Sequence, residues 1–472
     1  MESLQQNPQQ NPLATQSIGR LLLKYAIPSI VAMLVSALYN IVDQIFIGQG
    51  VGVLGNAATN VAFPIVTACT SLALLLGIGG ASNFNLKMGA GEREQAGLIA
   101  GNAIFLLASA GIGLMIIVFA FLQPLLYAFG ATEQVYDYAY TYTSITAIGI
   151  PFLIFATGAS HLIRADGSPR YAMMCTLAGA ILNTILDPLF IFTFHMGVAG
   201  AAIATVIGQG VSCVLAIIYL TRYRSVHFTR AHFKLSGQRI KRICGLGGAS
   251  CFNQLAMMAV QIAMNNTLTY YGQNSIYGQE IPLACAGIII KVNMIMMALV
   301  IGIAQGCQPI VGFNYGAKNY GRVKHTFRLA LTCSTIISVV AFLCFQLFPR
   351  QIISIFGSGS EEYFLFAERY FRIFLFLTFL NGLQPVIANF FTSIGKATRG
   401  IFLSMTRQII FLLPLILLLP LFMGIDGVMY AGPVADGAAA ILALIFVIRE
   451  MNLMTRQERE LAAQQAIPAE QP

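Results

Sequence analysis

The chain has 472 residues, of which 57% are hydrophobic and only 10% are charged, and its mean hydropathy is +0.75. Soluble domains carry about 25% charged residues, so this composition excludes a soluble enzyme or binding module and indicates an integral membrane protein. The net charge of +9 does not imply a nucleic-acid partner, because the basic residues are confined to a few short segments between apolar runs.

The chain starts with MESLQQNPQQNP, which is polar and lacks a basic region. We therefore expect no cleaved signal peptide and a cytoplasmic N-terminus. Apolar runs of about twenty residues or more follow, each long enough to cross a hydrocarbon core of ~30 Å. The twelve predicted spans are residues 20–48, 57–82, 95–123, 137–163, 171–195, 198–221, 243–271, 282–307, 327–349, 363–394, 400–423 and 428–448.

Basic residues gather in the even-numbered connections between these spans. They are Lys87, Arg93, Arg164, Arg170, seven residues within 222–242, Lys318, Arg322, Lys324, Lys396 and Arg399. The opposite connections clearly hold only Arg350. The positive-inside rule then predicts a multi-pass protein of the bacterial cytoplasmic (inner) membrane with both termini in the cytoplasm. The basic segment 222–242 is interpreted as a topology signal beside anionic lipid.

The two halves of the chain repeat each other at a constant offset of 227 residues. MGAG at 88–91 matches YGAK at 315–318, LYAFGATEQ matches ISIFGSGSE, and GVAG at 197–200 matches GIDG at 424–427. An offset of six spans, an even number, predicts parallel repeats related by an axis along the membrane normal. The predicted organisation is a polar cytoplasmic tail (1–19), a six-helix bundle (20–221), a basic cytoplasmic linker (222–242), a second bundle (243–450) and a polar cytoplasmic tail (451–472).

Two acidic residues lie inside apolar spans of the first half: Asp43 in the first span and Asp187 in the fifth. A rise of 1.5 Å per residue places both roughly 8–12 Å below the outer ends of their helices. Charged side chains at such depth are costly and usually functional. Two acids at one depth in one half therefore predict an ion site.

Other polar residues fall at the same level. Asn183 lies one turn before Asp187 on the same helix face, Thr205 lies in the sixth span and Tyr142 in the fourth. Such oxygen donors suit Na⁺, with Asp43, Asp187, Asn183 and Thr205 as ligands, or a proton held on a desolvated carboxyl group. Interhelical hydrogen bonding is the alternative role for Asn183, Thr205 and Tyr142.

The second half lacks matching acids, because LDPLF of the fifth span corresponds to LLPLI at 412–416. This asymmetry favours a dedicated ion site in the first half. Lys291 lies ten residues into the eighth span and either faces a cavity or serves a local partner. Arg407 is expected to extend to the cytoplasmic surface, Asp436 is a weak candidate, and His161 is expected to be solvated.

Methionines cluster in the seventh and eighth spans, where flexible thioethers suit either core packing or a surface that accepts many ligands. The candidates for a substrate cavity are Lys291, Asn40, Met257, Met264 and Met294.

The sequence resembles the MATE (multidrug and toxic compound extrusion) transporters, in the bacterial branch that includes DinF- and MepA-like proteins. The resemblance covers residues 15–450. Five segments carry it together: YNIVDQIFIGQGVG, GGASNFNLKMGAGERE, IRADGSPRYAMMCTLAGAILNTILDPLFIF, GCQPIVGFNYGAKNYGRVK and TSIGKATRG.

The resemblance implies an all-α fold of twelve transmembrane helices in two six-helix bundles, V-shaped around a central cavity. It implies export of organic cations and amphipathic drugs in exchange for H⁺ or Na⁺. The family's first-half cation site matches Asp43, Asn183, Asp187, Thr205 and Tyr142. The NorM-type branch uses acids of the seventh and tenth helices instead, and these have no counterpart in the corresponding regions of this sequence.

The sequence therefore predicts a secondary active exporter that works by alternating access, without a cofactor other than the coupling ion, and as a monomer. The main alternative is a lipid-linked oligosaccharide flippase of the same superfamily, which we expect to carry several cavity cations where this chain has only Lys291. A channel is disfavoured, because it would need rings of like charge and no such ring recurs in both halves of the sequence. An enzyme or an ATP-driven pump would need catalytic or phosphate-binding motifs that the sequence lacks.

Overall fold

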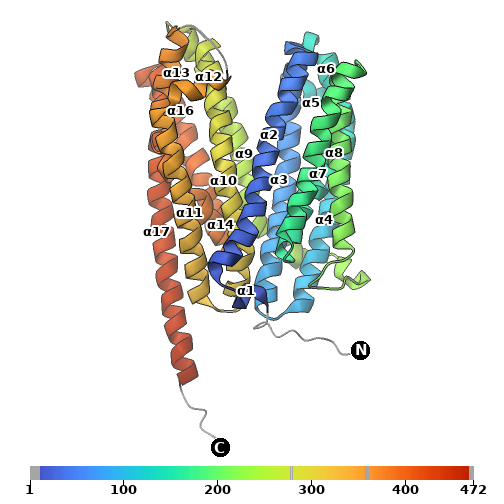
Figure 1. The fold of residues 1–472 in the computed structure, drawn as a ribbon, viewed down its shortest axis with the longest axis vertical. Coiled ribbons are helices and arrows are strands. Elements are labelled where there is room, and N and C mark those ends of the chain that lie inside the picture. The colour runs from blue at the N-terminus through green and yellow to red at the C-terminus, as the bar shows by residue number, and fades with distance from the viewer. Residues whose placement is uncertain (1–10, 277, 279, 357–360, 467–472) are drawn as a thin grey trace, which may run out of the picture. The chain divides into compact units, whose positions relative to one another are not determined.

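A computed structural model describes residues 11–276, 278, 280–356 and 361–466. Within these residues the chain is helical and has no strand. Twelve helices of this part are long and apolar enough to cross a membrane (Figure 1), which confirms the predicted fold class. Tyr142 and the other residues predicted for the cation site therefore lie on long membrane-spanning helices.

The first half of the chain supplies six of these spans. Its helices are α1 (Pro12–Thr15), α2 (Ile18–Gly50), α3 (Val53–Gly89), α4 (Arg93–Ala120), α5 (Leu122–Ala128), α6 (Glu133–Ala165), α7 (Pro169–Pro188) with the π-helical turn η2 (Leu189–Thr193), and α8 (Gly197–Leu220). A loop containing the 3₁₀ turn η3 (Arg230–Phe233) leads to the second half.

The second half supplies the other six spans. Its helices are α9 (Gly237–Gln273), α10 (Glu280–Gly316), α11 (Tyr320–Leu347), α12 (Pro349–Phe356), α13 (Glu361–Phe374), η4 (Thr378–Leu380), α14 (Leu383–Ser393), α15 (Ala397–Met405), the π-helical turn η5 (Thr406–Leu412), α16 (Leu413–Met423) and α17 (Ile425–Ala466).

The helices form two compact units. The N-terminal unit comprises Ile27–Phe84 and Arg93–Ala259, and the C-terminal unit comprises Met1–Ala26, Asn85–Glu92 and Val260–Pro472. Compared with the two bundles expected from the sequence, the units exchange short segments. Residues 20–26 and 85–92 join the C-terminal unit, whereas the linker and residues 243–259 join the N-terminal unit.

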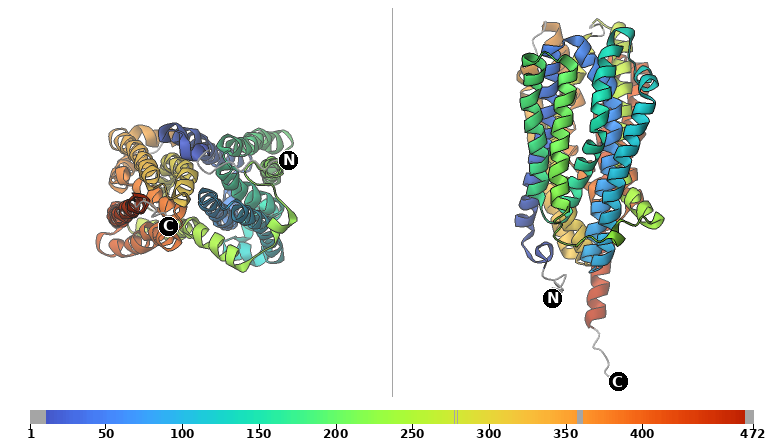
Figure 2. Two further views of the ribbon diagram at one scale, coloured as in Figure 1. Left: turned by 90° about the horizontal axis from the view of Figure 1, so that it is seen from below. Right: turned by 90° about the vertical axis from the view of Figure 1, so that its right-hand side faces the viewer.

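Small residues bring the helices of the N-terminal unit close together. A methyl group on Gly77 of α3 would lie 2.6 Å from the backbone of Gly158 on α6, and one on Gly111 of α4 would lie 2.7 Å from Pro151. Lipid offers no hydrophobic driving force between helices, so packing at such small residues holds them together. The right panel of Figure 2 shows the helices of this unit running side by side along its length.

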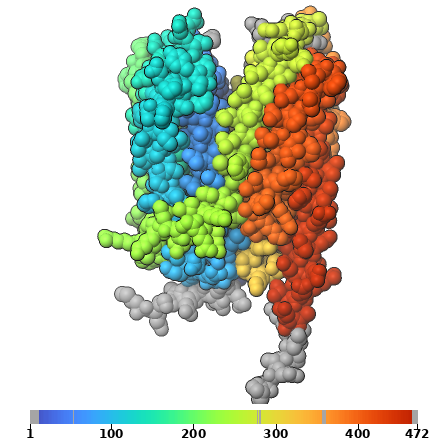
Figure 3. All heavy atoms as spheres, turned by 180° about the vertical axis from the view of Figure 1, so that it is seen from behind, coloured from blue at the N-terminus to red at the C-terminus, as the bar shows by residue number. Residues whose placement is uncertain are grey.

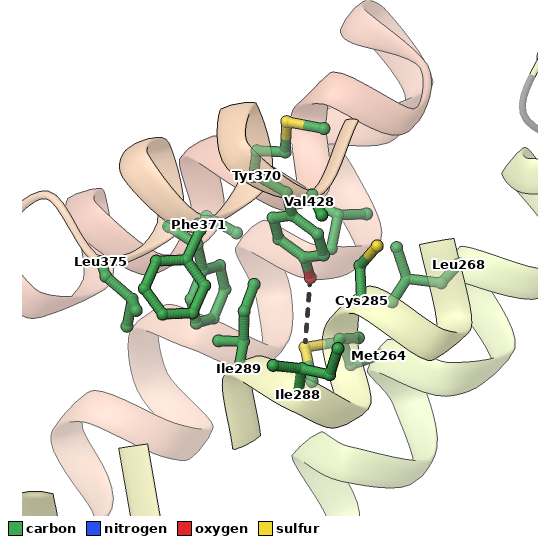
Figure 4. Close-up of a cluster of buried hydrophobic side chains, with 14 of the residues drawn as sticks. Met264, Leu268, Cys285, Ile288, Ile289, Tyr370, Phe371, Leu375 and Val428 are labelled. Carbon is green, nitrogen blue, oxygen red and sulfur yellow. Dashed lines mark hydrogen bonds between the residues drawn. The ribbon is translucent and has the colours of Figure 1, made fainter. Parts of the chain in front are cut away.

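The C-terminal unit is built around a cluster of buried aliphatic and aromatic side chains from α9, α10, α13, α16 and α17. Figure 4 shows Tyr370 of α13 directed toward Met264 of α9, with its hydroxyl 3.9 Å from the thioether sulfur. Met264 is 6% exposed and therefore belongs to this core.

Two sequence-based expectations need correction. Arg407 does not extend to the surface, because its Nε donates to buried Asp436 of α17. His161 is buried beside Arg164 rather than solvated. Residues 451–466 of the predicted polar tail are helical and continue α17, and Glu458 there pairs with Lys324 at 2.6 Å. The end of the predicted tail, 467–472, lies outside the described residues.

Candidate functional site

Helices α7 and α8 of the N-terminal unit lie in contact along one face of each. Four steps follow each other along this face: Tyr171 with Leu215, Cys175 with Ser212, Gly179 with Gly208, and Asn183 with Thr205. Positions four apart on α7 share one face because the helix has 3.6 residues per turn. The next position of this series on α7 is Asp187, so the helix packing itself places the acid one turn beyond the Asn183–Thr205 pair.

Asn183 connects the polar residues of these two helices. Its Nδ2 donates to Oδ1 of Asp187 at 3.2 Å and to Oγ1 of Thr205 at 3.3 Å. Asn183 is 2% exposed and Asp187 is 0% exposed. A buried amide that makes two side-chain bonds holds both partners in fixed positions, and so the orientation of the Asp187 carboxylate is fixed.

Helices α2 and α6 bring further polar groups to the same place. The carboxyl group of Asp43 on α2 lies next to that of Asp187. Tyr39, one turn earlier on α2, and Tyr142 on α6 both lie close to Thr205. Four helices thus contribute oxygen atoms to one cluster, which we call the acid-pair cluster: Tyr39, Asp43, Tyr142, Asn183, Asp187 and Thr205.

Several oxygen atoms of the acid-pair cluster are buried without a hydrogen-bond partner among the described residues. They are Oδ1 of Asp43, Oδ2 of Asp187 and Oδ1 of Asn183. Buried polar atoms are normally satisfied, and an unpaired carboxylate oxygen in an apolar interior is strongly unfavourable. Three such oxygens in one cluster define an acceptor set that fits a hard cation or a proton.

An apolar layer covers the acid-pair cluster toward the ends of its helices. Ile47 and Ile191 lie one turn beyond Asp43 and Asp187, and both are buried in a cluster with Val198, Ala201 and Ala202. Exclusion of water from this side strengthens every electrostatic interaction inside the cluster.

The backbone beside Asp187 is irregular. Pro188 follows directly and cannot donate a helical hydrogen bond, and η2 then widens the helix to a π turn. Such turns are frequent at functional sites because they re-aim the side chains around them. The irregularity therefore lies at the carboxylate that the sequence analysis singled out.

The structure brings together all five residues predicted for the cation site: Asp43, Tyr142, Asn183, Asp187 and Thr205. The sequence analysis missed Tyr39 of the acid-pair cluster. The spacing in the sequence could have indicated Tyr39, because it lies four residues before Asp43 and so on the same face of α2.

The residues predicted for a substrate cavity are divided between the two units: Asn40 and Met257 belong to the N-terminal unit, and Met264, Lys291 and Met294 to the C-terminal unit. Met264 lies in the core of the C-terminal unit, whereas Lys291 on α10 is half-buried. Met257 and Met294 are 45% and 40% exposed. Asn40 on α2 is exposed, and its side-chain amide bonds the carbonyl oxygen of Ser36 at 2.7 Å.

Fold and site together define a class of protein: an α-helical, multi-pass membrane protein of duplicated design with a buried acid pair in one half. The family model described as MatE matches residues 28–189 and 249–418, one match in each half of the chain. The chain belongs to the MATE family.

Relatives and solved structures agree with this assignment. The chain is 23% identical to the multidrug export protein MepA of Staphylococcus haemolyticus, and the match covers 94% of this chain and 96% of MepA. The MepA of Staphylococcus aureus strain MSSA476 is 21% identical over the same shares of both chains.

Two solved structures illustrate the fold. An outward-facing multidrug resistance MATE transporter of the MOP superfamily superposes with a TM-score of 0.87 at 22% identity, covering 94% of this chain and 98% of that one. A MOP-superfamily transporter from Pyrococcus furiosus, whose binding pocket of reversed polarity suggests a different function, also reaches 0.87 at 23% identity, over 96% and 100% of the chains. The fold is therefore shared by transporters for which different functions have been suggested.

Proposed function

We propose that this protein is a secondary active multidrug exporter that exchanges H⁺ or Na⁺ for organic cations and amphipathic drugs by alternating access. The observation that carries the proposal is the acid-pair cluster, in which Asp43 and Asp187 adjoin each other with unpaired oxygens. The relatives named multidrug export proteins support the substrate class.

The proposed mechanism starts from the instability of two adjacent carboxylates in an apolar unit. A proton shared between Asp43 and Asp187, or a Na⁺ ion held by both together with Asn183 and Thr205, removes that repulsion. Binding of the ion then favours the conformation of α2, α7 and α8 that holds it. Departure of the ion favours a second conformation of the same helices. Only such a difference in ion affinity between two states can drive the export step.

The same proposal places the protein in the cytoplasmic membrane of a bacterium as a monomer with both termini inside. Basic residues in the even-numbered connections support this orientation. The acid-pair cluster then lies toward the outer side, where an ion enters down its gradient, and no cofactor besides that ion is needed.

The test is efflux of a fluorescent organic cation from proteoliposomes under a Na⁺ gradient or a pH gradient imposed separately. We expect one gradient to drive efflux and the Asp43→Asn variant to lose it, since an amide cannot hold the ion by charge. Asp137→Asn, which removes an exposed acid of α6, is the matched control and should behave as the parent protein.

Two outcomes would contradict the proposal. Efflux that neither gradient drives would reject secondary transport of such cargo and leave a flippase as the next hypothesis. Full drug resistance in cells that carry Asp43→Asn at the parent's expression level would reject the role of the acid-pair cluster.

A further inference from the structure

The loop that joins α8 to α9 is fixed to the outside of the N-terminal unit. Figure 3 shows this segment, in yellow-green, lying across the lower part of the bundle, and the right panel of Figure 2 shows it at the side of the helices. The loop carries seven basic residues within 222–242. A charged linker of this kind would be expected to extend into water, and its fixed position therefore needs a cause.

Two buried polar side chains hold the loop in place. Asp166, at the end of α6, accepts hydrogen bonds from the Tyr219 hydroxyl at 2.7 Å and from the backbone N–H groups of Arg224 and Ser225 at 2.8 and 2.9 Å. Carboxylate bonds of this type are the stronger class of hydrogen bond. The first residues of the loop are thereby anchored against the helices.

The second anchor is Asn102 of α4, which is 0% exposed. Its Nδ2 donates to the carbonyl oxygens of His232 and Lys234, both at 3.0 Å, and its Oδ1 accepts from the N–H of Ser236 at 3.2 Å. Gly97 and Gly101 allow the close approach, because a methyl group at either would collide with His232.

Between the two anchors the loop covers a cavity of about 850 Å³. Its wall on the helices is apolar and includes Ile104 of α4 and Phe155 of α6, whereas its mouth includes Arg222, Arg224 and His227 of the loop. Phe155 lies ten residues before the end of α6, where Asp166 holds Arg224, and this places it about 15 Å from that anchor along the helix. The cavity is thus apolar on the side of the helices and basic on the side of the loop.

The arginines at the mouth are available to an anionic ligand. Both are exposed, and the ion pairs found in the described part of the chain include neither of them. The backbone of Arg224, not its guanidinium group, contacts Asp166. Guanidinium groups match phosphate geometry well, and basic pockets at membrane helix ends select anionic headgroups.

We propose that this cavity holds one anionic phospholipid, with its phosphate against Arg222 and Arg224 and an acyl chain along Ile104 and Phe155. An acyl chain accounts for the apolar wall of the cavity, which a soluble phosphate would leave uncovered. The occupant therefore comes from the bilayer leaflet beside the loop. The bound lipid ties the α8–α9 loop, and with it the connection between the two halves of the chain, to the composition of the membrane.

The chain offers a clean optical test, because it contains no tryptophan. Phe155→Trp places a single tryptophan in the cavity wall, and Phe105→Trp places one at an exposed position beside Ile104 on α4 as the control. Both variants are reconstituted in phosphatidylcholine vesicles with a minor fraction of dibrominated phosphatidylglycerol or dibrominated phosphatidylcholine.

For the Phe155→Trp variant, we expect brominated phosphatidylglycerol to occupy the cavity about tenfold more readily than brominated phosphatidylcholine, as measured by quenching of the tryptophan fluorescence. The reason is that each nearby arginine favours an anionic lipid severalfold. At Phe105→Trp the two lipids should quench alike. Adding Arg222→Gln with Arg224→Gln should abolish the preference. Arg230→Gln with Lys234→Gln removes the same charge from the same loop outside the cavity and should retain it.

Equal quenching by both lipids at Phe155→Trp, or a preference that survives Arg222→Gln with Arg224→Gln, would overturn the proposal. Relief of quenching by inorganic phosphate would assign the site to a soluble anion and overturn it as well. Mass spectrometry of lipids that copurify with the parent protein gives a second measurement that needs no tryptophan. Phosphatidylglycerol should be retained there and lost in the double arginine variant.

Discussion

Gly179 of α7 meets Gly208 of α8 backbone to backbone. A methyl group on Gly208 would lie 2.7 Å from the carbonyl oxygen of Gly179, so neither residue has room for a side chain. This contact sets the distance between the two helices one turn below Asn183 and Thr205, whose hydrogen bond spans 3.3 Å. The geometry of the acid-pair cluster thus depends on two residues that carry no chemistry.

We predict that Gly208→Ala separates α7 from α8 and destabilises the protein by about 1–3 kcal/mol, the usual cost of overpacking. Efflux should fall as well, because Asn183 can then no longer bond Asp187 and Thr205 together. Gly210→Ala, two residues later on α8, is the control, since its methyl group would meet only Phe152 at 4.0 Å. Thermal unfolding in detergent compares the two, and equal melting temperatures would contradict the prediction.

The two acids should act as one unit. Asp43 and Asp187 lie next to each other, so removal of either charge should dismantle the proposed ion site. We predict that Asp43→Asn, Asp187→Asn and the double variant lose efflux to the same extent, because residues that act together are strongly non-additive. Initial efflux rates from proteoliposomes measure this. If the fold-loss in the double variant instead equals the product of the two single fold-losses, Asp43 and Asp187 have independent roles.

The ion pair between Arg407 and Asp436 should stabilise the C-terminal unit. Their side chains are 15% and 2% exposed. Removing one partner leaves an uncompensated buried charge, so we predict that Asp436→Asn costs about 3–5 kcal/mol. Adding Arg407→Gln should recover part of that loss.

The control for this pair lies on α17 itself. Glu460→Gln breaks an exposed pair with Arg456, and its effect should stay below about 1 kcal/mol. Detergent melting curves of these three variants and of the parent protein give the comparison. If Asp436→Asn melts at the parent's temperature, the buried pair does not carry the stability assigned to it.

The anchor at Asp166 predicts how the α8–α9 loop responds to a protease. Asp166→Asn replaces an acceptor for three donors by an amide and weakens bonds worth about 1.5–3 kcal/mol each. Trypsin should therefore cut within 222–242 at least about tenfold faster, since local opening precedes cleavage. Asp137→Asn should leave the rate unchanged. An unchanged rate in Asp166→Asn would mean that Asn102 alone fixes the loop.

The spans and the acid-pair cluster could largely be predicted from the sequence, for a physical reason. In an apolar run each charged residue is conspicuous, and the rise of 1.5 Å per residue converts its position into a depth. The sequence positions of Asp43 and Asp187 were therefore enough to predict that both acids lie at the same depth in the membrane, without any knowledge of helix packing. Tyr39 was missed because a tyrosine is ordinary within a membrane helix and became informative only beside Thr205.

Pairing between distant helices could not be predicted in this way. Arg407 and Asp436 lie 29 residues apart on different elements, and only the packing of α17 against η5 brings them together. The basic loop was interpreted only as a topology signal beside anionic lipid, since its contacts with Asn102 and Asp166 depend on backbone groups that carry no sequence signal. The polar composition of 451–466 also did not predict that this part of the tail continues α17, with Glu458 paired to Lys324.

The length of α17 has a practical consequence for imaging. In Figure 1 this helix extends beyond the other helices of its unit, and sixteen residues separate Glu450, which binds Lys396 and Arg399, from its last residue, Ala466. A protein of 51.0 kDa that is mostly embedded in a micelle has little density outside the micelle by which particle images can be aligned in electron microscopy. A rigid marker protein joined to α17 through a continuous helix would supply such density, because its orientation would follow that of the C-terminal unit.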